Sequence, residues 1–272
     1  MILCRYTTSE RCIELIKDQR LYAANPVVDF NDPFEFCLGT VGEINREDMD
    51  RHYRNNLRPR LSADLQKKLP EDLTNEAWET LKPTYKQKRK QDNEESIKDA
   101  VEKTIRIICF CDPDKIKNGG EDILLWSHYA NGHKGVKIYF NTEHIKTISE
   151  NLFPVFYSEE RPGIDITDPN HENAEEVCRS IIQTKNKSWH YEQEFRWIIH
   201  IDECIKENGR MYIPFLPEAI RRIDLGCRCN KREDIMAVLK ENKAYKHVKM
   251  YDALVHEHKF ALEYKEIELD NL

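Results

Sequence analysis

The most informative stretch of the sequence runs from Lys185 to Arg196, reads KNKSWHYEQEFR, and continues directly into WIIHI. Glu192, Glu194 and Arg196 take alternate positions in a segment that predicts a strand. Side chains two apart in a strand share one face, roughly 6.5–7 Å from each other. Two carboxylates and a guanidinium would therefore form a row on a sheet. Such a row either shifts a carboxylate pKa and grips a polar substrate, or it is an exposed face with an ordinary ion pair.

Strand-like segments lie on both sides of this stretch. They alternate or run apolar, as strands do, over residues 2–6, 20–24, 104–112, 135–141, 153–159, 247–254 and 260–267. Helices are predicted after Thr8 or Ser9 and near residues 123–130, 173–187 and 231–243. Strands of antiparallel type with helices inserted between them predict a single α+β domain over residues 1–272, not a doubly wound parallel sheet.

Residues 44–103 differ from the rest in composition. They are rich in charged residues and poor in β-branched ones, which predicts two to four solvated helices, interrupted at Pro59, Pro70 and Pro83. We expect these helices to be an insertion that caps the domain. The basic run KQKRKQ at residues 86–91 either contacts phosphates or is the solvated face of a helix, and the second role is the commoner one for such a run.

Composition limits the class of protein. The formal net charge of -7 excludes a uniformly basic nucleic-acid binder, although 42 Lys and Arg leave room for a local basic groove. The opening MILCRYTTSERC has only three apolar residues before charge begins, so no export signal is predicted. No apolar run approaches the length of a membrane span. These patterns favour a cytoplasmic protein without a membrane partner.

Nine cysteines in such a chain predict reduced thiols. Two C-x-C pairs, Cys109/Cys111 and Cys227/Cys229, raise the alternative of a four-thiolate zinc site. Their single-residue spacing is shorter than structural zinc sites prefer, and both pairs lie in or beside apolar strand-like runs, where Cys acts as a small hydrophobe. We therefore expect no metal.

Polar residues stand beside aromatic ones at four places: Arg5-Tyr6, the Asn31-Asp32-Pro33 loop, the group Trp126, His128 and Tyr129, and the stretch from Glu192 to Arg196. An arginine and a wall of aromatic rings suit a flat, phosphate-bearing ligand such as a nucleotide. The alternative is structural, with Trp126 and Tyr129 as core anchors and His128 as a hydrogen-bonded histidine. The commonest hydrolase, NTPase, Rossmann and zincin motifs do not occur in the sequence.

Several short motifs together resemble a known bacterial family. They are R-Y near the start, L-Y-x-x-x-P, F-N-D-P-F-E, I-C-F-C, L-L-W-S-H-Y-A-N-G-H-K-G and K-x-x-x-W-x-x-E-x-E-x-R. Their combination resembles the family called domain of unknown function 2971, over most of the chain apart from residues 44–103. The family name implies no activity.

The order of elements is also similar to the ADP-ribosyltransferase fold, particularly its DNA-modifying toxin branch. Arginine-type transferases carry E-x-E or Q-x-E on a late strand, which Glu192-Gln193-Glu194 matches. The resemblance implies a split antiparallel sheet, with Glu194 as the catalytic carboxylate, Glu192 as the acceptor-side carboxylate and Arg5 on the NAD phosphates. The Ser-Thr-Ser strand motif of that branch is absent, and the loop at Asn31 would take its place.

This resemblance implies an enzyme that cleaves NAD and transfers ADP-ribose to a nucleic acid or protein, as a bacterial toxin or anti-phage effector restrained by an antitoxin or chaperone. The expected NAD-binding residues are Arg5, Tyr6, Asn31, Trp126, His128, Tyr129 and Arg196. Two alternatives stay open. One is a non-catalytic module that binds a nucleotide or a partner, and the other is a simple NAD glycohydrolase, which needs Glu194 but no acceptor site.

Overall fold

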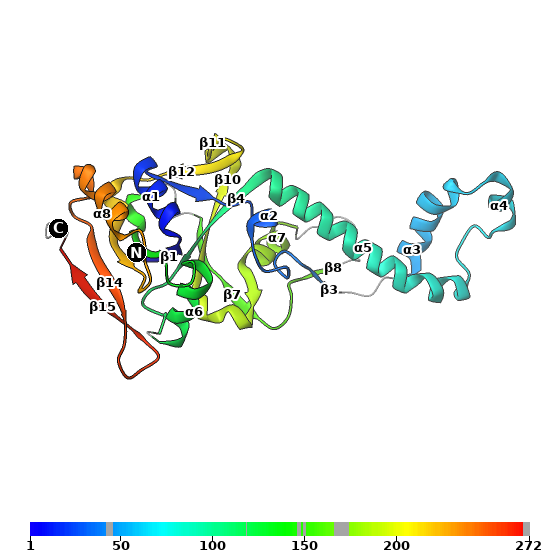
Figure 1. Ribbon diagram of the computed structural model, residues 1–272. Coiled ribbons are helices and arrows are strands. Elements are labelled where there is room, and N and C mark those ends of the chain that lie inside the picture. Colours follow the sequence, from blue (N-terminus) through cyan, green and yellow to red (C-terminus); the bar gives the residue numbers. More distant parts are fainter. Residues whose placement is uncertain (42–45, 118, 146–147, 149–150, 166–173, 269–272) are drawn as a thin grey trace. The chain divides into compact units, whose positions relative to one another are not determined.

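The computed structural model describes residues 1–41, 46–117, 119–145, 148, 151–165 and 174–268 (Figure 1). The chain forms two compact units. The first comprises residues 1–31, 102–157 and 185–272, and the second comprises residues 32–101 and 158–184. The sequence predicts one domain with an insertion at residues 44–103. In the structure that segment lies largely in the second unit, which also takes in residues 158–184.

A mixed sheet of eight strands forms the centre of the first unit. Its order is β15 (Leu262–Ile267), β14 (Lys249–Val255), β13 (Ile220–Leu225), β5 (Val136–Asn141), β1 (Ile2–Thr7), β4 (Ile105–Cys111), β10 (Glu194–His200) and β6 (Leu152–Pro154). Strands β13 and β14 run parallel, and the other neighbouring strands are antiparallel. The α+β class is confirmed.

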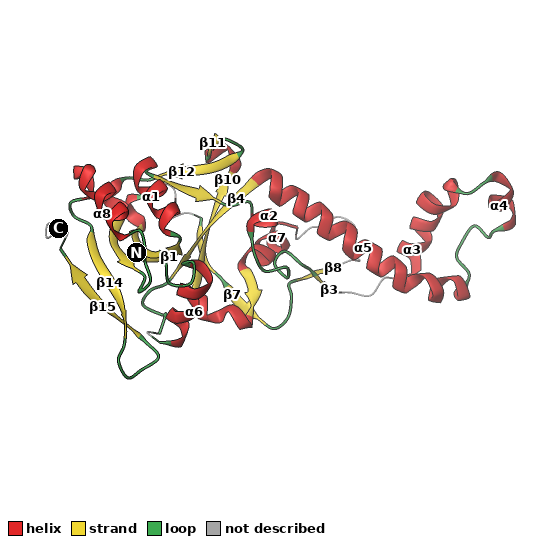
Figure 2. Ribbon diagram, in the orientation of Figure 1, coloured by secondary structure: helices red, strands yellow, loops and turns green. Residues whose placement is uncertain are grey.

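Smaller elements complete this unit (Figure 2). A three-stranded sheet joins β11 (Ile205–Glu207), β12 (Arg210–Pro214) and β2 (Arg20–Ala23), and β7 (Phe156–Ser158) pairs with β9 (Thr184–Asn186). The helices are α1 (Ser9–Asp18), α2 (Pro26–Asp29), α6 (Gly120–Tyr129) and α8 (Arg232–Glu241), with 3-10 turns at Thr142–His144, Lys187–Glu192, Ile201–Glu203, Pro217–Ala219 and Lys243–Tyr245.

The two faces of the large sheet differ in character. Leu3, Phe110 and Trp197 belong to an apolar core that also contains buried residues of α1 and α8. Cys4 and Tyr6, which alternate with Leu3 along β1, instead pack with α6 in a second cluster. Strand alternation therefore sends polar and sulfur-bearing side chains to the face that α6 covers.

The second unit contains α3 (Arg46–His52), a π-helical turn (Tyr53–Leu57), a 3-10 turn (Arg58–Arg60), α4 (Ala63–Lys68), most of α5 (Asn75–Thr104), α7 (Ala174–Gln183) and a parallel pair, β3 (Gly39–Val41) with β8 (Gly163–Asp165). Pro59 lies in the 3-10 turn and Pro70 follows α4, as the sequence predicts. The predicted break at Pro83 is wrong, because α5 continues through it. Proline removes only one hydrogen bond of a helix, and the neighbouring turns of a long helix hold the chain.

Three further boundaries differ from expectation. The helix expected over residues 173–187 ends at Gln183, and Asn173 lies outside the described residues. The strand expected over residues 153–159 is split into β6 and β7. The last strand begins at Leu262, so Phe260 lies in the turn before it.

Candidate functional site

A turn places the two glutamates side by side. Residues Lys187–Glu192 form a 3-10 helix, which Asn186 caps by accepting a hydrogen bond from the Ser188 backbone N–H at 2.9 Å. Gln193 then takes a left-handed conformation with φ 46°, and β10 begins at Glu194. The expected row of three side chains along one strand is therefore wrong for Glu192, because a left-handed residue breaks the strand alternation before it starts.

Lys185 brings the carboxylates together. Its ammonium lies 2.6 Å from Oε2 of Glu192 and 3.1 Å from Oε2 of Glu194. Arg196, the next residue on the same face of β10, donates from Nε to Oε1 of Glu194 at 2.9 Å. The Tyr129 hydroxyl donates to Oε1 of Glu192. We call Lys185, Glu192, Glu194 and Arg196 the carboxylate cluster.

The carboxylate cluster is buried. Glu192 is 3%, Glu194 5% and Arg196 0% exposed, so the alternative of an exposed strand face is wrong. Two cations facing two carboxylates allow this burial, because a buried charge without a partner would be far more costly.

Burial and charge move the two carboxyl groups apart in pKa. Desolvation is the largest influence on Glu192 and raises its pKa to about 7, against the opposing effect of Lys185. Burial also acts to raise the pKa of Glu194, but Arg196 and Lys185 outweigh it and hold that pKa well below its usual range. Near neutral pH the pair therefore contains one fully ionised carboxylate and one group that can take up or release a proton. Neighbouring carboxyls with separated pKa values are the pattern of acid–base catalysis.

Register places small thiols beside these carboxylates. Glu194 pairs with Cys111 of β4, which pairs in turn with Cys4 of β1, and Arg196 pairs with Cys109. Directly paired residues of an antiparallel sheet share a face. Burial is the main cause that raises the pKa of the Cys109 thiol, and the charge of Glu194 adds to it. Cys109 is therefore a neutral neighbour of Glu194.

Arg5 lies at the point on β1 where the registered pairing with β4 ends. β1 and β4 share one registered pair, at Cys4 and Cys111, immediately before Arg5. The Nη1 atom of Arg5 is buried and has no hydrogen-bond partner among the described residues. Burial lowers the pKa of this guanidinium, and Cys109 and Cys111 act on it electrostatically. Cys109 also interacts electrostatically with Glu194, whereas Arg5, which alternates with Cys4 along β1, belongs to the face of β1 that carries Leu3.

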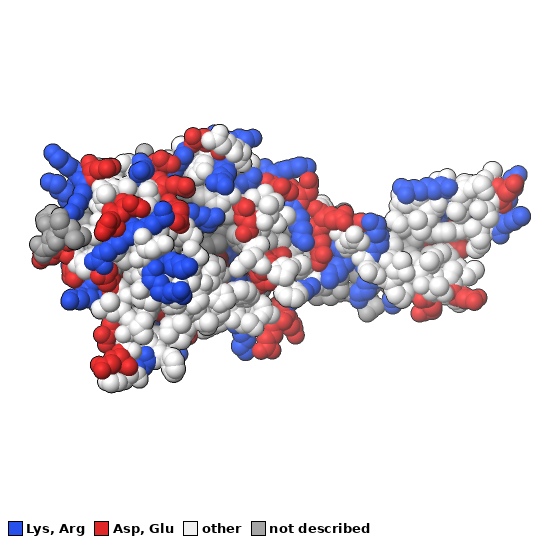
Figure 3. Space-filling model, viewed as in Figure 1, with Lys and Arg blue, Asp and Glu red and all other residues white. Residues whose placement is uncertain are grey.

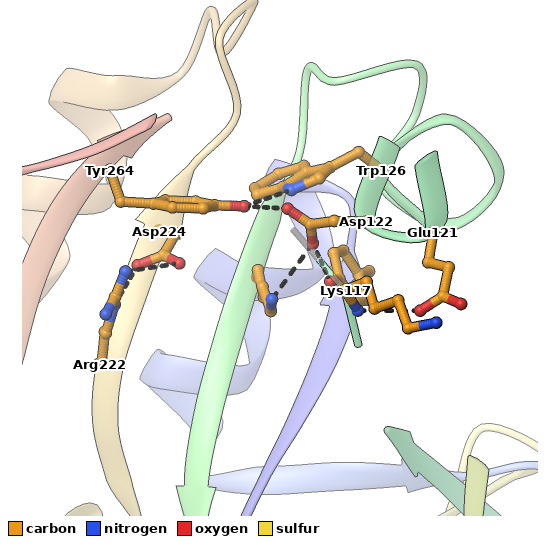
Figure 4. A network of polar contacts seen from close by, with 9 residues as sticks. Lys117, Glu121, Asp122, Trp126, Arg222, Asp224 and Tyr264 are labelled. Atoms are coloured by element: carbon orange, nitrogen blue, oxygen red, sulfur yellow. Dashed lines mark hydrogen bonds and ion pairs between the residues drawn. The ribbon is translucent and has the colours of Figure 1, made fainter. Parts of the chain in front are cut away.

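Trp126 and Tyr6 lie in the interior of the first unit. Trp126 is 0% exposed and its indole N–H donates to the Tyr264 hydroxyl at 3.1 Å. The Tyr6 hydroxyl donates to Asp122 at 2.5 Å, and Tyr264 donates to the other oxygen of Asp122 (Figure 4). Lys137 completes the network at 3.2 Å from Asp122. These contacts match the alternative that Trp126 is a core anchor.

Aromatic rings on the exposed side come from two elements. His128 is exposed at the end of α6, with its ring centroid 6.2 Å from those of Trp189 and Tyr191. The Lys185 ammonium also lies 5.1 Å from the centroid of the Trp189 ring. His128 and Tyr129 therefore contact the 3-10 helix Lys187–Glu192, which carries Glu192. These rings are exposed or half-buried, unlike that of Trp126.

Asn31 and Arg196 are the remaining residues that the sequence predicts for the site. Asn31 is exposed, and within the described ranges no hydrogen bond joins it to the carboxylate cluster. The Arg196 guanidinium lies against the Phe30 ring, 5.1 Å from its centroid. Arg196 thus contacts Glu194 and an aromatic ring of its own unit.

Three residues at the site were missed as functional candidates. Lys185 and Trp189 are the fixed first and second letters of K-x-x-x-W-x-x-E-x-E-x-R, so the motif itself contained the signal. From the sequence alone, nothing about a lysine seven residues before Glu192 shows that a turn will place it against two carboxylates. Tyr157, whose hydroxyl accepts from the Glu194 backbone N–H at 2.9 Å, was also missed.

The described residues contain no group of three or more His, Cys, Asp or Glu side chains that could hold a metal ion. Cys109 and Cys111 lie on β4, whereas Cys227 and Cys229 follow β13, on the opposite side of β1 and β5 in the strand order. Within the described part of the chain, no helix is both long and apolar enough to cross a membrane.

Comparison with known proteins gives one match. Neither the curated proteins nor the solved structures contain a significant match to this chain. Residues 125–197 match the model of a family described as "Protein of unknown function (DUF2971)", and this segment contains the whole carboxylate cluster together with Tyr129 and Trp189.

Proposed function

We propose that the protein is an ADP-ribosyltransferase-like enzyme that cleaves NAD and transfers ADP-ribose to a nucleic acid or protein acceptor. One observation carries the proposal: Lys185 joins two buried carboxylates whose pKa values are driven apart. A carboxylate that stays ionised and a neighbour that exchanges a proton near pH 7 are the two groups that glycosyl transfer requires.

Glu194 is suited to the bond-breaking step. When the bond between ribose C1′ and the nicotinamide nitrogen breaks, its electron pair leaves with nicotinamide and the ribose becomes oxocarbenium-like. A fixed negative charge that accepts a hydrogen bond from the ribose 2′-hydroxyl stabilises this state more than the ground state. Arg196 and Lys185 keep Glu194 ionised and oriented for that contact.

Glu192 is suited to the transfer step. An acceptor O–H or N–H that replaces the Tyr129 hydroxyl at Glu192 would form its bond to C1′ while its proton passes to the Glu192 carboxylate. The pKa of about 7 lets this group accept the proton at neutral pH and release it to solvent afterwards. Water in the acceptor's place would give NAD hydrolysis with the same groups.

Arg5 is suited to binding the phosphates of NAD. A buried guanidinium nitrogen without a partner among the described residues offers a charge-assisted donor, and phosphate oxygens are strong acceptors for it. The single registered pair between β1 and β4 also supports the split sheet of the ADP-ribosyltransferase fold. A cytoplasmic toxin or anti-phage effector, restrained by an antitoxin or chaperone, is the setting that we propose.

The test is release of nicotinamide from NAD by the full chain, alone and with RNA, DNA or bacterial lysate. Glu194→Gln keeps the size of the side chain and removes its charge, so we expect release to fall by at least about 100-fold. Glu218→Gln is the matched control at an exposed site and should retain full activity. Undiminished release in Glu194→Gln would contradict the proposed role, and the additive that accelerates release would indicate the acceptor.

A non-catalytic binding module is the second candidate, because the Glu194 carboxylate is already paired with two cations in its own chain. Such a module should be stabilised thermally by NAD or another nucleotide without releasing nicotinamide. Stabilisation that is lost in Arg5→Ala and unaffected by Glu194→Gln, with no release in either, would favour this candidate.

A further inference from the structure

Charged side chains of both signs are interspersed over the face of the molecule in Figure 3. Exposed ion pairs contribute little, so surface charge does not mark a binding face there. The buried surroundings of Glu194, in contrast, contain a contact that ordinary sheet pairing does not provide. The Glu194 backbone N–H donates to the Tyr157 hydroxyl at 2.9 Å. A side chain thus takes the place of a main-chain acceptor at the first residue of β10.

Strand register shows which acceptor the Tyr157 hydroxyl replaces. The β10–β6 ladder pairs Phe195 with Pro154, so the next pair in the same register is Glu194 with Val155. Hydrogen-bonded pairs of an antiparallel ladder exchange both N–H···O bonds. One of the two is present, since the Val155 N–H donates to the Glu194 carbonyl at 2.9 Å. In a regular ladder the Glu194 N–H would return to the Val155 carbonyl, and here it goes to Tyr157 instead.

The cause is a fork between two sheets. The chain pairs with β10 as β6, through Pro154, and from Phe156 it continues as β7, which pairs with β9. The β6 ladder therefore ends beside Glu194, and Tyr157, the middle residue of β7, reaches back to the N–H at the fork. An unpaired buried N–H would be unfavourable, so the hydroxyl satisfies a backbone group that β6 does not.

The small sheet of β7 and β9 thus holds Glu194 by two contacts. β7 carries Tyr157, which accepts from the Glu194 backbone, and β9 carries Lys185, whose ammonium lies 3.1 Å from Oε2 of the same residue. The Tyr157 ring also packs edge-on against His190, with 5.2 Å between centroids. His190 belongs to the 3-10 helix that carries Glu192. Tyr157 therefore contacts both elements that bear the glutamates.

A neutral hydroxyl suits this position. Burial is the main cause that raises the pKa of Tyr157, and the charges of Glu194 and Glu192 act in the same direction. The phenol therefore stays protonated. It accepts the Glu194 N–H without adding a third negative charge beside the two carboxylates, whereas an acidic side chain in its place would repel them.

We propose that Tyr157 is a positioning residue for Glu194: its hydroxyl fixes the Glu194 backbone, and so fixes the place at which this carboxylate meets its cations and the ribose. The contact with the ribose rests on the proposed function, whereas the placement of Glu194 does not. A misplacement of about 1 Å can lower a rate by about 100-fold. The loss appears in kcat when the contact is stronger in the transition state than in the ground state.

The first test is nicotinamide release by Tyr157→Phe, which removes the hydroxyl and keeps the ring. We expect kcat to fall by about 10- to 100-fold while KM for NAD stays within about threefold. Tyr245→Phe is the matched control, because the buried Tyr245 hydroxyl also bonds the backbone, donating to the Ile16 carbonyl at 3.0 Å, and Tyr245 lies in the apolar core. Both variants should lose similar thermal stability, and only Tyr157→Phe should lose kcat.

The second test is proton–nitrogen correlation NMR of the full chain, and it needs no activity. The Arg196 Nε–H donates to Oε1 of Glu194 at 2.9 Å, so its proton resonance reports the position of the carboxylate. A proton leaves a low-field position when a charge-assisted hydrogen bond lengthens. We therefore expect this resonance to move upfield in Tyr157→Phe and to stay in place in Tyr245→Phe.

Three results would overturn the inference: an unchanged kcat in Tyr157→Phe, an equal fall of kcat in Tyr245→Phe, or an Arg196 Nε–H resonance that does not move in Tyr157→Phe. A raised KM with unchanged kcat would also overturn it and indicate that Tyr157 contacts the substrate directly. If the wild type releases no nicotinamide but the resonance moves as expected, the proposed function alone is contradicted. If the wild type is active and the resonance does not move, this inference alone is contradicted.

Discussion

Lys185 is the residue on which the carboxylate cluster depends. Its ammonium contacts both Glu192 and Glu194, and the three side chains are about 5% exposed or less. Water cannot screen two carboxylates at such burial, so their mutual repulsion must be balanced by protein cations. Arg196 contacts Glu194 directly, which leaves Lys185 as the cation shared by both carboxylates.

Lys185→Met should therefore destabilise the fold by about 3–5 kcal/mol at pH 8, the usual cost of removing one partner from a buried ion pair. Urea unfolding followed by circular dichroism measures it. The double variant Lys185→Met/Glu192→Gln should recover part of the loss, because one of the two repelling charges is gone. An equal or larger loss in the double variant would show that Lys185 stabilises by packing and not by charge.

Glu192 gives the cluster a pH dependence whose sign can be stated. Its pKa in the folded protein is about 7, above the ordinary value of 4.5. Between these values the folded state holds more protons than the unfolded state, so this group's contribution to stability falls as pH rises from about 4.5 through about 7. In Glu192→Gln, the melting temperature should therefore depend less on pH over this range than in the wild type, when both are measured from about pH 5 to about pH 8. Glu218→Gln, at an exposed site, should leave the profile unchanged, and an unchanged profile in Glu192→Gln would contradict the raised pKa.

At the scale of elements, three strand ladders and one turn build the site. Registered pairing places Tyr139, Cys4, Cys111 and Glu194 in one row across β5, β1, β4 and β10. The turn at Gln193 folds the 3-10 helix back so that Glu192 meets this row. A one-residue slip in the β4–β10 ladder would send Glu194 to the apolar face, so the apolar core on that face fixes the carboxylate's position.

Gly135 sets how closely β5 approaches β1. A Cβ at this position would lie 2.1 Å from the Thr7 carbonyl oxygen, a backbone atom that cannot move aside alone. Gly135→Ala should therefore cost about 3 kcal/mol or more in unfolding free energy. Gly120→Ala is the control, because a Cβ there meets nothing within 4 Å, and in a helix it should raise stability by up to about 1 kcal/mol. Denaturant titration of both variants checks the pair, and equal stabilities would contradict the close approach.

At the scale of the whole molecule, the chain is held without disulfides. All nine cysteines are free thiols, and Cys4 and Cys12 are buried. A thiol assay in denaturant should find nine reactive groups per chain, and a reductant should leave the melting temperature unchanged. Fewer than nine thiols, or a melting temperature that falls in reductant, would contradict the free state of these cysteines.

Burial explains which of the sequence predictions succeeded. Alternation and apolar runs predict most strands of the large sheet within a few residues, because burial of one or both faces imposes those patterns. The weak, exposed β11 carries no such pattern and was missed. The expected break at Pro83 failed because a polar 30-residue helix gives no apolar period from which its continuity could be inferred.

The sequence alone determined the α+β class, the E-x-E pair at the start of β10 and the charged helical region, since each depends on local pattern and residue type. It also singled out Glu192, Glu194 and Arg196 as one group. Only the tertiary structure decided that Lys185 joins the two carboxylates, that Cys109 interacts electrostatically with both Arg5 and Glu194, and that Trp126 is a core residue. The physical reason is that burial, which sets charge pairing and pKa, arises from contacts between segments far apart in the chain.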